Sequence, residues 1–558
     1  MQEAIESVLP ALTVFFSLVF TLFVVALAVG GLALTWFSIR EGERRAAWIG
    51  GFLFTTGGFL AAIAVNGNLQ GVLTNGGMLP GNGSLALPGL AVLLGAILIL
   101  RPWNLKPPVS RGTLDYLTGP VRRFDQRDVV LTRTRLTPGT PTYQDYYLRH
   151  PEREQRDAVT RAMKPPTGKA GSIDAGNPFN VAMHEALSRF PIKMSLMAEA
   201  AGPGTAGAHA PVAAAASGGT VPNPVSSPEG PPIEALVALD GGVRARGGPA
   251  HQGLSSTPLV LDPVELTLRV KGFARYLGAD LVGITGLRKE WIYSHAGEIH
   301  TQYTEEWGKP ITLDHSHAIV IATRMRDEMV VSRPHTPMYT EVMRNYSLVT
   351  WITHQMVSFL NNLGYEARAH HWRNYQVLCV PLAVDAGLGE LGRNGYLVTG
   401  KYGLKVRLAA VTVTAPLLTD RPISFGVQDF CGRCSRCARL CPAGSIPAGD
   451  KVIHNHVRKW KLDEQSCLEY WCRVGTSCGI CMAVCPWSHP DSPPHRLARF
   501  FARRSPAGRR TLTRLEEFMY GRNPKPRAGN RWSDYRPYRP PVSSQAGAIH
   551  KSTETTET

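Results

Sequence analysis

Nine of the ten cysteines in this chain of 558 residues lie between Cys431 and Cys485. Small secreted domains held by disulfides spread their cysteines in pairs along the chain. Cysteines gathered at short intervals are instead typical of metal or iron–sulfur binding in a reducing compartment. The first block reads Cys431-Gly-Arg-Cys434-Ser-Arg-Cys437-Ala-Arg-Leu-Cys441-Pro442, and the second reads Cys478-Gly-Ile-Cys481-Met-Ala-Val-Cys485-Pro486. The C-terminal part of the chain is therefore predicted to be built around inorganic clusters.

The spacing within the two blocks matches the pattern of two interlocked [4Fe–4S] clusters. Three cysteines separated by two residues bind one cluster, and the fourth, followed by proline, binds the other. We assign one cluster to Cys431, Cys434, Cys437 and Cys485, and the second to Cys467, Cys478, Cys481 and Cys441. Cys472 is the alternative to Cys467. Zinc would explain a single C-x-x-C pair but not the interlocked pattern, and Cys379, in an apolar run, is interpreted as a core residue.

Two stretches near the N-terminus carry no charged residue at all. They cover residues 7–39, which is 33 residues, and residues 46–100, which is 55 residues. A helix needs about 20 apolar residues to cross a bilayer. We therefore predict a membrane anchor over residues 1–111 with three transmembrane helices, within residues 7–39, 46–65 and 85–100. Buried core helices, or a twin-arginine signal at Arg44-Arg45, are the alternatives.

The basic residues around these stretches predict the orientation of the anchor. Arg40, Arg44 and Arg45 lie in the first loop, and Arg101, Lys106 and Arg111 follow the third stretch, whereas the loop at residues 66–84 is uncharged. Basic loops stay in the cytoplasm. We therefore expect a multi-pass protein of the cytoplasmic membrane with everything after Arg101 on the cytoplasmic side.

The rest of the chain is predicted to have an α+β fold. We expect helices over residues 262–277 and 340–364, and buried strands over residues 280–285, 317–323 and 406–414. Residues 200–257, rich in Ala, Gly, Pro and Ser, are interpreted as a low-complexity insertion or linker. The expected units are 112–199, the N-terminal part of the catalytic region; 258–425, an α/β domain; 426–490, the two-cluster domain; 491–542, a basic segment; and 543–558, a disordered tail.

Several motifs together resemble one known family. They are Val384-Asp-Ala-Gly-Leu-Gly-Glu-Leu-Gly-Arg-Asn-Gly395, Tyr402-Gly-Leu-Lys-Val-Arg407, the cysteine blocks with Cys485-Pro-Trp487, Phe124-Asp-Gln-Arg127, Tyr143-Gln-Asp-Tyr-Tyr147 with His150-Pro-Glu152, and Glu516-Glu-Phe-Met-Tyr-Gly521. In this combination the chain resembles the corrinoid-dependent reductive dehalogenases over roughly residues 124–521, outside the insertion. Members of that family usually have an exported catalytic part and a separate anchor protein, whereas the anchor here is fused.

The resemblance implies the fold and the cofactors. A nitroreductase-like α/β domain over residues 258–425 would bind cobalamin, and a ferredoxin-like domain with two [4Fe–4S] clusters would deliver electrons to it. The chain has no D-x-H-x-x-G motif, which agrees with the base-off, histidine-free binding of the corrinoid in the family.

The resemblance also implies site residues. Tyr346 would donate a proton and Lys405 would stabilise its phenolate, with Arg407 as the competing cation. Gly387, Gly389, Gly392 and Arg393 would contact the corrinoid. For the glycines, a turn that needs a positive φ is the alternative. His370, His371 and Trp372 look like a cluster, but we assign them no role.

The expected function is reductive cleavage of a carbon–halogen bond in an organohalide by a membrane-anchored enzyme. The electron donor is open between a quinol, a ferredoxin and a flavodoxin. Two other functions are weighed: a corrinoid reductase acting on epoxyqueuosine in tRNA, and a membrane electron carrier. The formal net charge of +17 is compatible with nucleic acid. The three predicted spans argue against tRNA, and no nucleic-acid partner is expected.

Overall fold

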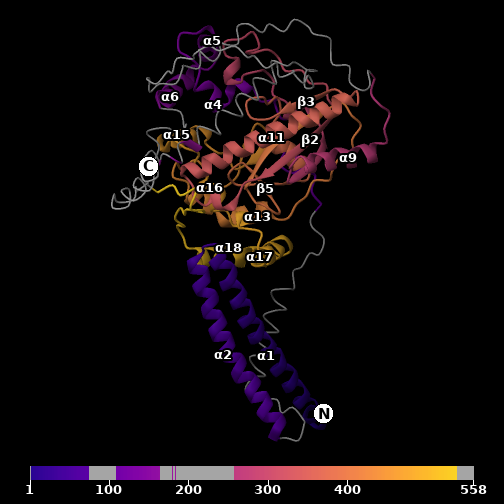
Figure 1. Ribbon diagram of the computed structural model, residues 1–558, viewed down its shortest axis with the longest axis vertical. Coiled ribbons are helices and arrows are strands. Elements are labelled where there is room, and N and C mark those ends of the chain that lie inside the picture. Colours follow the sequence, from indigo (N-terminus) through magenta and orange to yellow (C-terminus); the bar gives the residue numbers. More distant parts are fainter. Residues whose placement is uncertain are drawn as a thin grey trace, which may run out of the picture.

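The computed structural model describes residues 2–74, 109–163, 177, 179, 182–183 and 257–536, with side chains of the first segment described from Phe15 to Val65. An N-terminal pair of helices extends away from a globular part that contains all other described elements (Figure 1). The expected third span at residues 85–100, nearly all of the insertion at residues 200–257, and the tail from residue 543 lie outside the described residues.

The N-terminal helices α1 (Gln2–Arg40) and α2 (Arg44–Thr74) form an antiparallel hairpin. Small residues allow the close approach, since a Cβ at Gly31 would lie 2.4 Å from Phe54 N and one at Gly57 would lie 2.7 Å from Ala28 N. Large apolar side chains cover the outside, including Leu22 (68% exposed) and Trp48 (81% exposed). Two helical stretches, Phe15–Arg40 and Arg44–Val65, are long and apolar enough to cross a membrane.

A four-stranded antiparallel sheet forms the centre of the globular part. Its strands, in the order β1-β2-β6-β3, are β1 (Leu281–Gly286), β2 (His317–Arg324), β6 (Val406–Val413) and β3 (Ala367–His370). Both faces are covered, so the strands are apolar on both sides. Along β2, Ile319 and Ile321 pack into one core, and Ala318 and Val320 pack into another, as the two-residue period of a strand requires.

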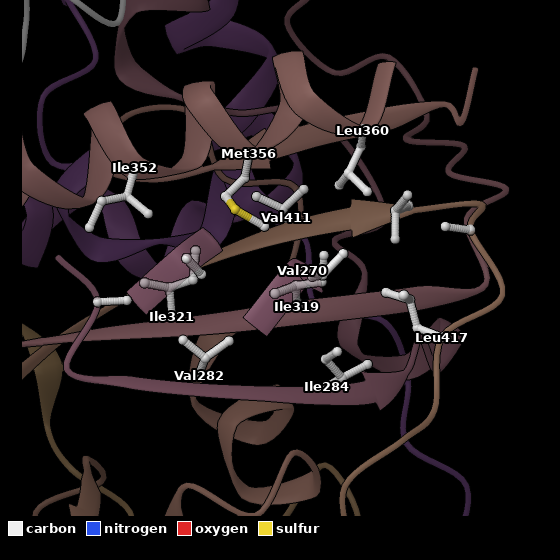
Figure 2. Close-up of a cluster of buried hydrophobic side chains, with 14 of the residues drawn as sticks. Val270, Val282, Ile284, Ile319, Ile321, Ile352, Met356, Leu360, Val411 and Leu417 are labelled. Carbon is white, nitrogen blue, oxygen red and sulfur yellow. The ribbon is translucent and has the colours of Figure 1, made fainter. Parts of the chain in front are cut away.

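Helix α11 (Thr336–Asn362) lies across one face of the sheet together with α9 (Pro263–Tyr276). Asp262 begins α9, because its carboxylate accepts a hydrogen bond from Glu265 N and Pro263 occupies the first turn. Ile352, Met356 and Leu360 point from α11 onto the sheet and are completely buried (Figure 2). The short helix α12 (Cys379–Asp385) covers the opposite face, and Cys379 packs against the core there, in line with its interpretation as a core residue.

The remaining elements surround this centre. Near the N-terminus of the globular part are η1 (Gly112–Asp115), η2 (Gln126–Asp128), α4 (Val130–Arg133), α5 (Pro141–Arg149) and α6 (Pro151–Ala162). Within the α/β region are η3 (Lys289–Trp291), η4 (Ile299–Thr301), α10 (Asp327–Val330), β4 (Gly389–Leu391) and β5 (Leu397–Thr399). The cysteine-rich part contains α13 (Val427–Cys434), α14 (Arg436–Arg439), β7 (Val452–His454), β8 (Val457–Lys459), α15 (Glu464–Val474), α16 (Ile480–Ala483) and η5 (Pro486–Ser488), followed by α17 (Pro493–Arg504) and α18 (Pro506–Tyr520).

The helices and strands expected from the sequence are confirmed with small shifts of their ends. The expected strands at residues 280–285, 317–323 and 406–414 are β1, β2 and β6, and the expected helices at residues 262–277 and 340–364 are α9 and α11. Helix α11 begins four residues earlier than expected, with Pro337 in its first turn. The predicted α+β class is therefore correct for the described residues.

Candidate active site

The cysteine-rich part gathers its thiols from short helices that are joined by sharp turns. Helix α13 carries Cys431 and Cys434, and α14 carries Cys437, with Ser435 between them in a left-handed conformation at φ 44°. This left-handed residue ends α13 and lets α14 begin in a new direction, so that three thiols can surround one cluster. All ten cysteines are free thiols.

The eight assigned cysteines lie close enough for their thiols to influence one another's ionisation, both within the two proposed sets and, for Cys437 and Cys481, between them. Burial raises the pKa of Cys437 and of Cys485, and the neighbouring thiols of Cys431 and Cys434 raise both further. Burial likewise raises the pKa of Cys467 to about 12, with further contributions from Cys481 and Cys441. Burial also raises the pKa of Cys478, and the thiols of Cys481, Cys467 and Cys441 raise it further. The thiols of each set therefore lie within electrostatic range of one another.

Cys472 is in a different environment from these eight cysteines. It lies on α15 one turn beyond Cys467, and Arg135 Nη2 donates a hydrogen bond to its sulfur over 3.2 Å. Burial raises its pKa, while the other groups that act on it are Arg135 and Glu469 rather than thiols. The structure thus places Cys467, and not Cys472, with the second set.

The donor set fits iron–sulfur clusters rather than a single ion. Among the described residues, no three His, Cys, Asp or Glu side chains converge closely enough to hold one metal ion, whereas a cubane binds each thiolate through a separate iron. Asn394 gives a second indication. Its buried side chain lies against the thiol of Cys481, and a hydrogen bond between the two lowers the pKa of that thiol. Asn394 would therefore face a cluster bound at Cys481.

Arg393 joins the α/β region to the cysteine-rich part. Its guanidinium donates to the carbonyl oxygens of Cys431, Pro447, Ala448 and Gly449 over 2.8–3.0 Å, and only 3% of the residue is exposed. Trp460 packs against the same group, with 4.4 Å from the guanidinium carbon to the ring centroid. The hydrogen bonds of Arg393 are thus directed to backbone carbonyls, and its contact with the corrinoid stays a prediction.

The three glycines expected at the corrinoid are required by the protein's own backbone. Gly387 has a φ of 71°, and a Cβ there would lie 2.4 Å from Arg421 O. A Cβ at Gly389 would lie 2.3 Å from Val398 O across the β4–β5 pair, and one at Gly392 would lie 2.9 Å from Asn394 Oδ1. The alternative interpretation, a turn that needs a positive φ, therefore holds for Gly387, and close packing explains Gly389 and Gly392.

Tyr346 lies in a cluster of aromatic and basic side chains. It projects from α11 and stacks on Trp372, with 5.4 Å between the ring centroids and 16° between the planes. The guanidinium carbon of Arg407, on β6, lies 5.6 Å from the centroid of the Tyr346 ring. Arg407 Nε is shielded from solvent, and no described residue accepts a hydrogen bond from it. Tyr346, Trp372 and Arg407 are all half-buried, so they present a partly open surface.

Lys405 lies apart from Tyr346 and has a different partner. It is 4% exposed, and its ammonium forms an ion pair with Asp327 of α10, which also binds Arg324. Burial lowers the pKa of Lys405, with Arg324 and Arg499 contributing further. The expected pairing of Tyr346 with Lys405 is therefore not the arrangement in the structure. Arg407, the competing cation, is the one beside the ring.

Tyr396 lies between the side chains around Tyr346 and the second set of cysteines. Burial raises its pKa, and the nearby charged or ionisable groups include Cys481, Cys467, Arg407 and Tyr346. Tyr346, Trp372 and Tyr396 pack against one hydrophobic cluster, which also contacts Cys431, Cys434, Cys481 and Cys485. Sequence analysis missed Tyr396 and Asn394, although both belong to or adjoin the Gly-Arg-Asn-Gly segment that it singled out.

The comparisons with known proteins agree with this geometry. Residues 430–489 match the family model described as "4Fe-4S dicluster domain", which makes the C-terminal part an iron–sulfur domain. The tetrachloroethene reductive dehalogenase of Sulfurospirillum multivorans is 35% identical over 261 residues, 41% of this chain and 52% of the relative. The tetrachloroethene reductive dehalogenase of Dehalobacter restrictus is 32% identical over 278 residues, which are 42% of this chain and 50% of the relative. The chain is thus homologous to the reductive dehalogenases, and it spans about half the length of these relatives.

More distant similarities also occur. An epoxyqueuosine reductase of Lactococcus garvieae is 28% identical over 127 residues, 21% of this chain and 35% of the relative. Among solved structures, a variant of a catabolic reductive dehalogenase is 27% identical with a TM-score of 0.45, covering 53% of this chain and 45% of that chain. The same enzyme in complex with 3-bromo-4-hydroxybenzoic acid is 22% identical with a TM-score of 0.46. This match covers 79% of this chain and 53% of that chain.

A buried histidine pair next to Trp372 predicts acid sensitivity. His371 Nε2 lies 3.0 Å from His354 Nε2, and burial together with His354 lowers the pKa of His371 to about 3. A histidine with a folded pKa near 3 and an unfolded pKa of about 6.5 contributes stability that is lost as the pH falls below 6.5, about 1.4 kcal/mol at pH 5.5. Chemical denaturation at pH 7.5 and 5.5 should show this loss in the wild type.

The same denaturation experiment on two variants attributes the effect. From pH 7.5 to pH 5.5, the free energy of unfolding of His371→Asn should fall by about 1.4 kcal/mol less than that of the wild type. His456→Asn, at an exposed turn, should keep the wild-type dependence. Equal pH dependence of His371→Asn and the wild type would contradict the assignment.

Proposed function

We propose that this chain is a membrane-anchored reductive dehalogenase. Replacing the halogen of an organohalide with hydrogen consumes two electrons and one proton and releases a halide ion. An iron–sulfur domain passes electrons singly, so two transfers complete one turnover. The homology to tetrachloroethene reductive dehalogenases supports this reaction class. The relatives' names indicate chlorinated alkenes as the proposed substrate class.

The observation that carries this proposal is the shared core between the side chains around Tyr346 and the cysteine domain. Tyr346 and Trp372 pack against the same hydrophobic cluster as Cys431, Cys481 and Cys485. Electrons arriving at these thiolates would therefore need to cross only packed side chains to reach a group bound at Tyr346. An electron carrier alone would have no need of a partly open aromatic surface at this position.

Tyr346 is proposed as the proton donor, with Arg407 as its cationic partner. A phenol has an unperturbed pKa of about 10, so it needs a nearby positive charge that stabilises the phenolate left after proton transfer. Arg407 lies over the ring, and its unpaired Nε provides a further donor beside Tyr346. This assignment replaces Lys405 with Arg407 and keeps Tyr346.

The side chains around Tyr346 suit a corrinoid in their chemistry, with aromatic faces at Tyr346 and Trp372 and an unsatisfied donor at Arg407. When bound, a corrinoid would supply a cobalt centre that is reducible enough to break a carbon–halogen bond. The absence of a D-x-H-x-x-G motif supports base-off binding. Tyr346 and Arg407 would then orient the substrate and hold the proton at the phenol oxygen.

The second candidate is reduction of epoxyqueuosine in tRNA, because epoxyqueuosine reductases match a segment of about 127 residues. The matches to reductive dehalogenases cover about twice that length, and we therefore favour dehalogenation. The electron donor stays open between a quinol, a ferredoxin and a flavodoxin.

The hairpin of α1 and α2 is proposed to anchor the chain in the cytoplasmic membrane. Glu41, in the turn of the hairpin, accepts a hydrogen bond from His495 Nε2 over 2.9 Å, and Glu43 pairs with Arg527 over 2.8 Å. These contacts support placing the first loop and the iron–sulfur domain on the same side of the membrane. The chain must then cross once more between Thr74 and Arg111, where the sequence predicts the third span. The basic residues of the first loop favour the cytoplasmic side.

The two-cluster proposal predicts different outcomes for Cys467 and Cys472. Anaerobically purified protein should contain about eight iron atoms and about eight sulfides. Cys467→Ala removes a ligand and should lose up to about half of both, whereas Cys472→Ala, the matched change one turn away, should keep them. Iron and sulfide analysis checks this. Loss of iron in Cys472→Ala but not in Cys467→Ala would reverse the assignment.

The proton-donor proposal predicts the effect of three variants at Tyr346 and Arg407. Tyr346→Phe should lower organohalide turnover by about 10²–10⁴-fold, the usual contribution of general acid catalysis, while retaining iron and cobalt. Arg407→Gln should also slow turnover, and Arg407→Lys should be milder because the charge is kept. Turnover should be measured under saturating reductant, with metal content as the control. A fully loaded Tyr346→Phe enzyme with normal turnover would show that the proton comes from elsewhere.

The anchoring proposal predicts the location of the catalytic part. A reporter fused after Arg111 should be active if it is a type that works in the cytoplasm and inactive if it requires export. A reporter fused at Thr74 should give the opposite result, because it follows the second span. Export-dependent activity after Arg111 would instead support the interpretation of Arg44-Arg45 as a signal.

A further inference from the structure

Helices α17 and α18 lie at the base of the globular part, where the α1–α2 hairpin emerges (Figure 1). Helix α17 contacts α1, and α18 contacts α2 and packs against α13. Contacts at both ends join the pair to the hairpin turn. His495, in the first turn of α17, pairs with Glu41, and Gly521, which ends α18, lies next to Arg45.

One face of this helix pair is fixed to the iron–sulfur domain. Glu516 and Met519 of α18 are buried, and Glu516 pairs with His489 over 3.0 Å. Arg509 pairs with Asp429 of α13 over 2.7 Å, and Arg499 Nη1 donates a hydrogen bond to His489 O over 3.1 Å. The opposite face must therefore point away from the iron–sulfur domain.

The outward face combines apolar and basic side chains. Leu497 is 57% exposed, Leu515 is 43% exposed and Phe518 is 56% exposed. The basic residues between them are Arg496, Arg504, Arg510 and Arg514, for which the described part of the chain offers no carboxylate within salt-bridge distance. The acidic residues of α17 and α18 are only Glu516 and Glu517, and Glu517 pairs with Arg439. We call this face of α17 and α18 the basal face.

We propose that the basal face lies on the surface of the bilayer and binds anionic lipid headgroups. The inference rests on the proposed membrane anchoring, because a hairpin that spans the membrane brings the basal face to the level of the headgroups. A helix with apolar side chains between arginines is typical of interfacial binding, in which the apolar groups enter the headgroup boundary and the arginines pair with phosphates. Each arginine near an anionic surface shifts such an equilibrium by about fivefold.

This contact would fix the orientation of the catalytic part above the membrane. The spans hold the chain in the membrane, and the contacts of α17 and α18 with the hairpin turn keep the basal face next to the point where the hairpin enters it. A second contact through the basal face would hold the iron–sulfur domain at a constant height above the bilayer. A donor that reaches the chain from the membrane would then meet the same surface at every encounter.

The test uses the full chain in nanodiscs of phosphatidylcholine alone or of phosphatidylcholine with phosphatidylglycerol. Hydroxyl-radical labelling read by mass spectrometry measures the solvent accessibility of single side chains. Labelling of Leu497 and Phe518 should slow at least about fivefold in the anionic discs, and high salt should reverse part of the effect. Leu268 and Tyr276 on α9, which are 61% and 84% exposed, should be labelled equally in both discs.

Two variants separate the charge effect from other causes. Arg510→Gln with Arg514→Gln should remove most of the lipid dependence. The matched change Arg275→Gln with Lys289→Gln, at exposed positions on α9 and η3, should leave it intact. All four positions are on the surface, so folding should be preserved.

The outcomes distinguish this inference from the anchoring on which it rests. Protection of Leu22 and Trp48 on the hairpin, with equal labelling of Leu497 and Phe518 in both discs, would overturn the inference and leave the anchor in place. Free labelling of the hairpin would overturn both. Protection that grows with protein concentration rather than with anionic lipid would show that the basal face binds a second copy of the chain.

Discussion

The buried guanidinium of Arg393 joins the α/β region to the iron–sulfur domain through hydrogen bonds. It follows the β4 strand and donates to the carbonyl of Cys431 and to three carbonyls of the loop before β7. Removing it would take a hydrogen-bond donor from each of these carbonyls, although Gly449 O would keep the bond from Trp460 Nε1. Its neighbour Asn394 lies against Cys481. The Gly-Arg-Asn-Gly segment therefore sets the spacing between the thiolates and Tyr346, on which single-electron transfer depends.

The backbone of this fold could be predicted largely from the sequence, because patterns of apolar residues encode it. Strands β1, β2 and β6 appear as β-branched runs, and α9 is marked by Asp262-Pro263. The iron–sulfur domain could be predicted too, since the spacing of its cysteines is typical of such domains and residues 430–489 match a 4Fe-4S dicluster domain. These features depend on residues that are near one another in the chain, so one sequence is enough to infer them.

The arrangement around Tyr346 was predicted less completely because it depends on which side chains meet across the sheet. Lys405 and Arg407 are two residues apart, and the sequence gives no reason to prefer one over the other. The structure shows that the start of β6 directs Lys405 to Asp327 and Arg407 to Tyr346. The partners of Arg393 could not be predicted either, since an arginine beside glycines suggests ligand binding whereas its hydrogen bonds go to carbonyls more than 35 residues away. Long-range partners of polar side chains are not written in a local motif.

The central claim is that electrons stored in the iron–sulfur domain remove halide from an organohalide bound near Tyr346. The most direct measurement is halide release by anaerobically purified, corrinoid-loaded chain supplied with a chemical reductant and a chlorinated alkene. We predict one halide ion and one dehalogenated product for every two electrons consumed. Electron consumption without halide release from any organohalide, together with reduction of epoxyqueuosine in a tRNA stem loop, would contradict the account.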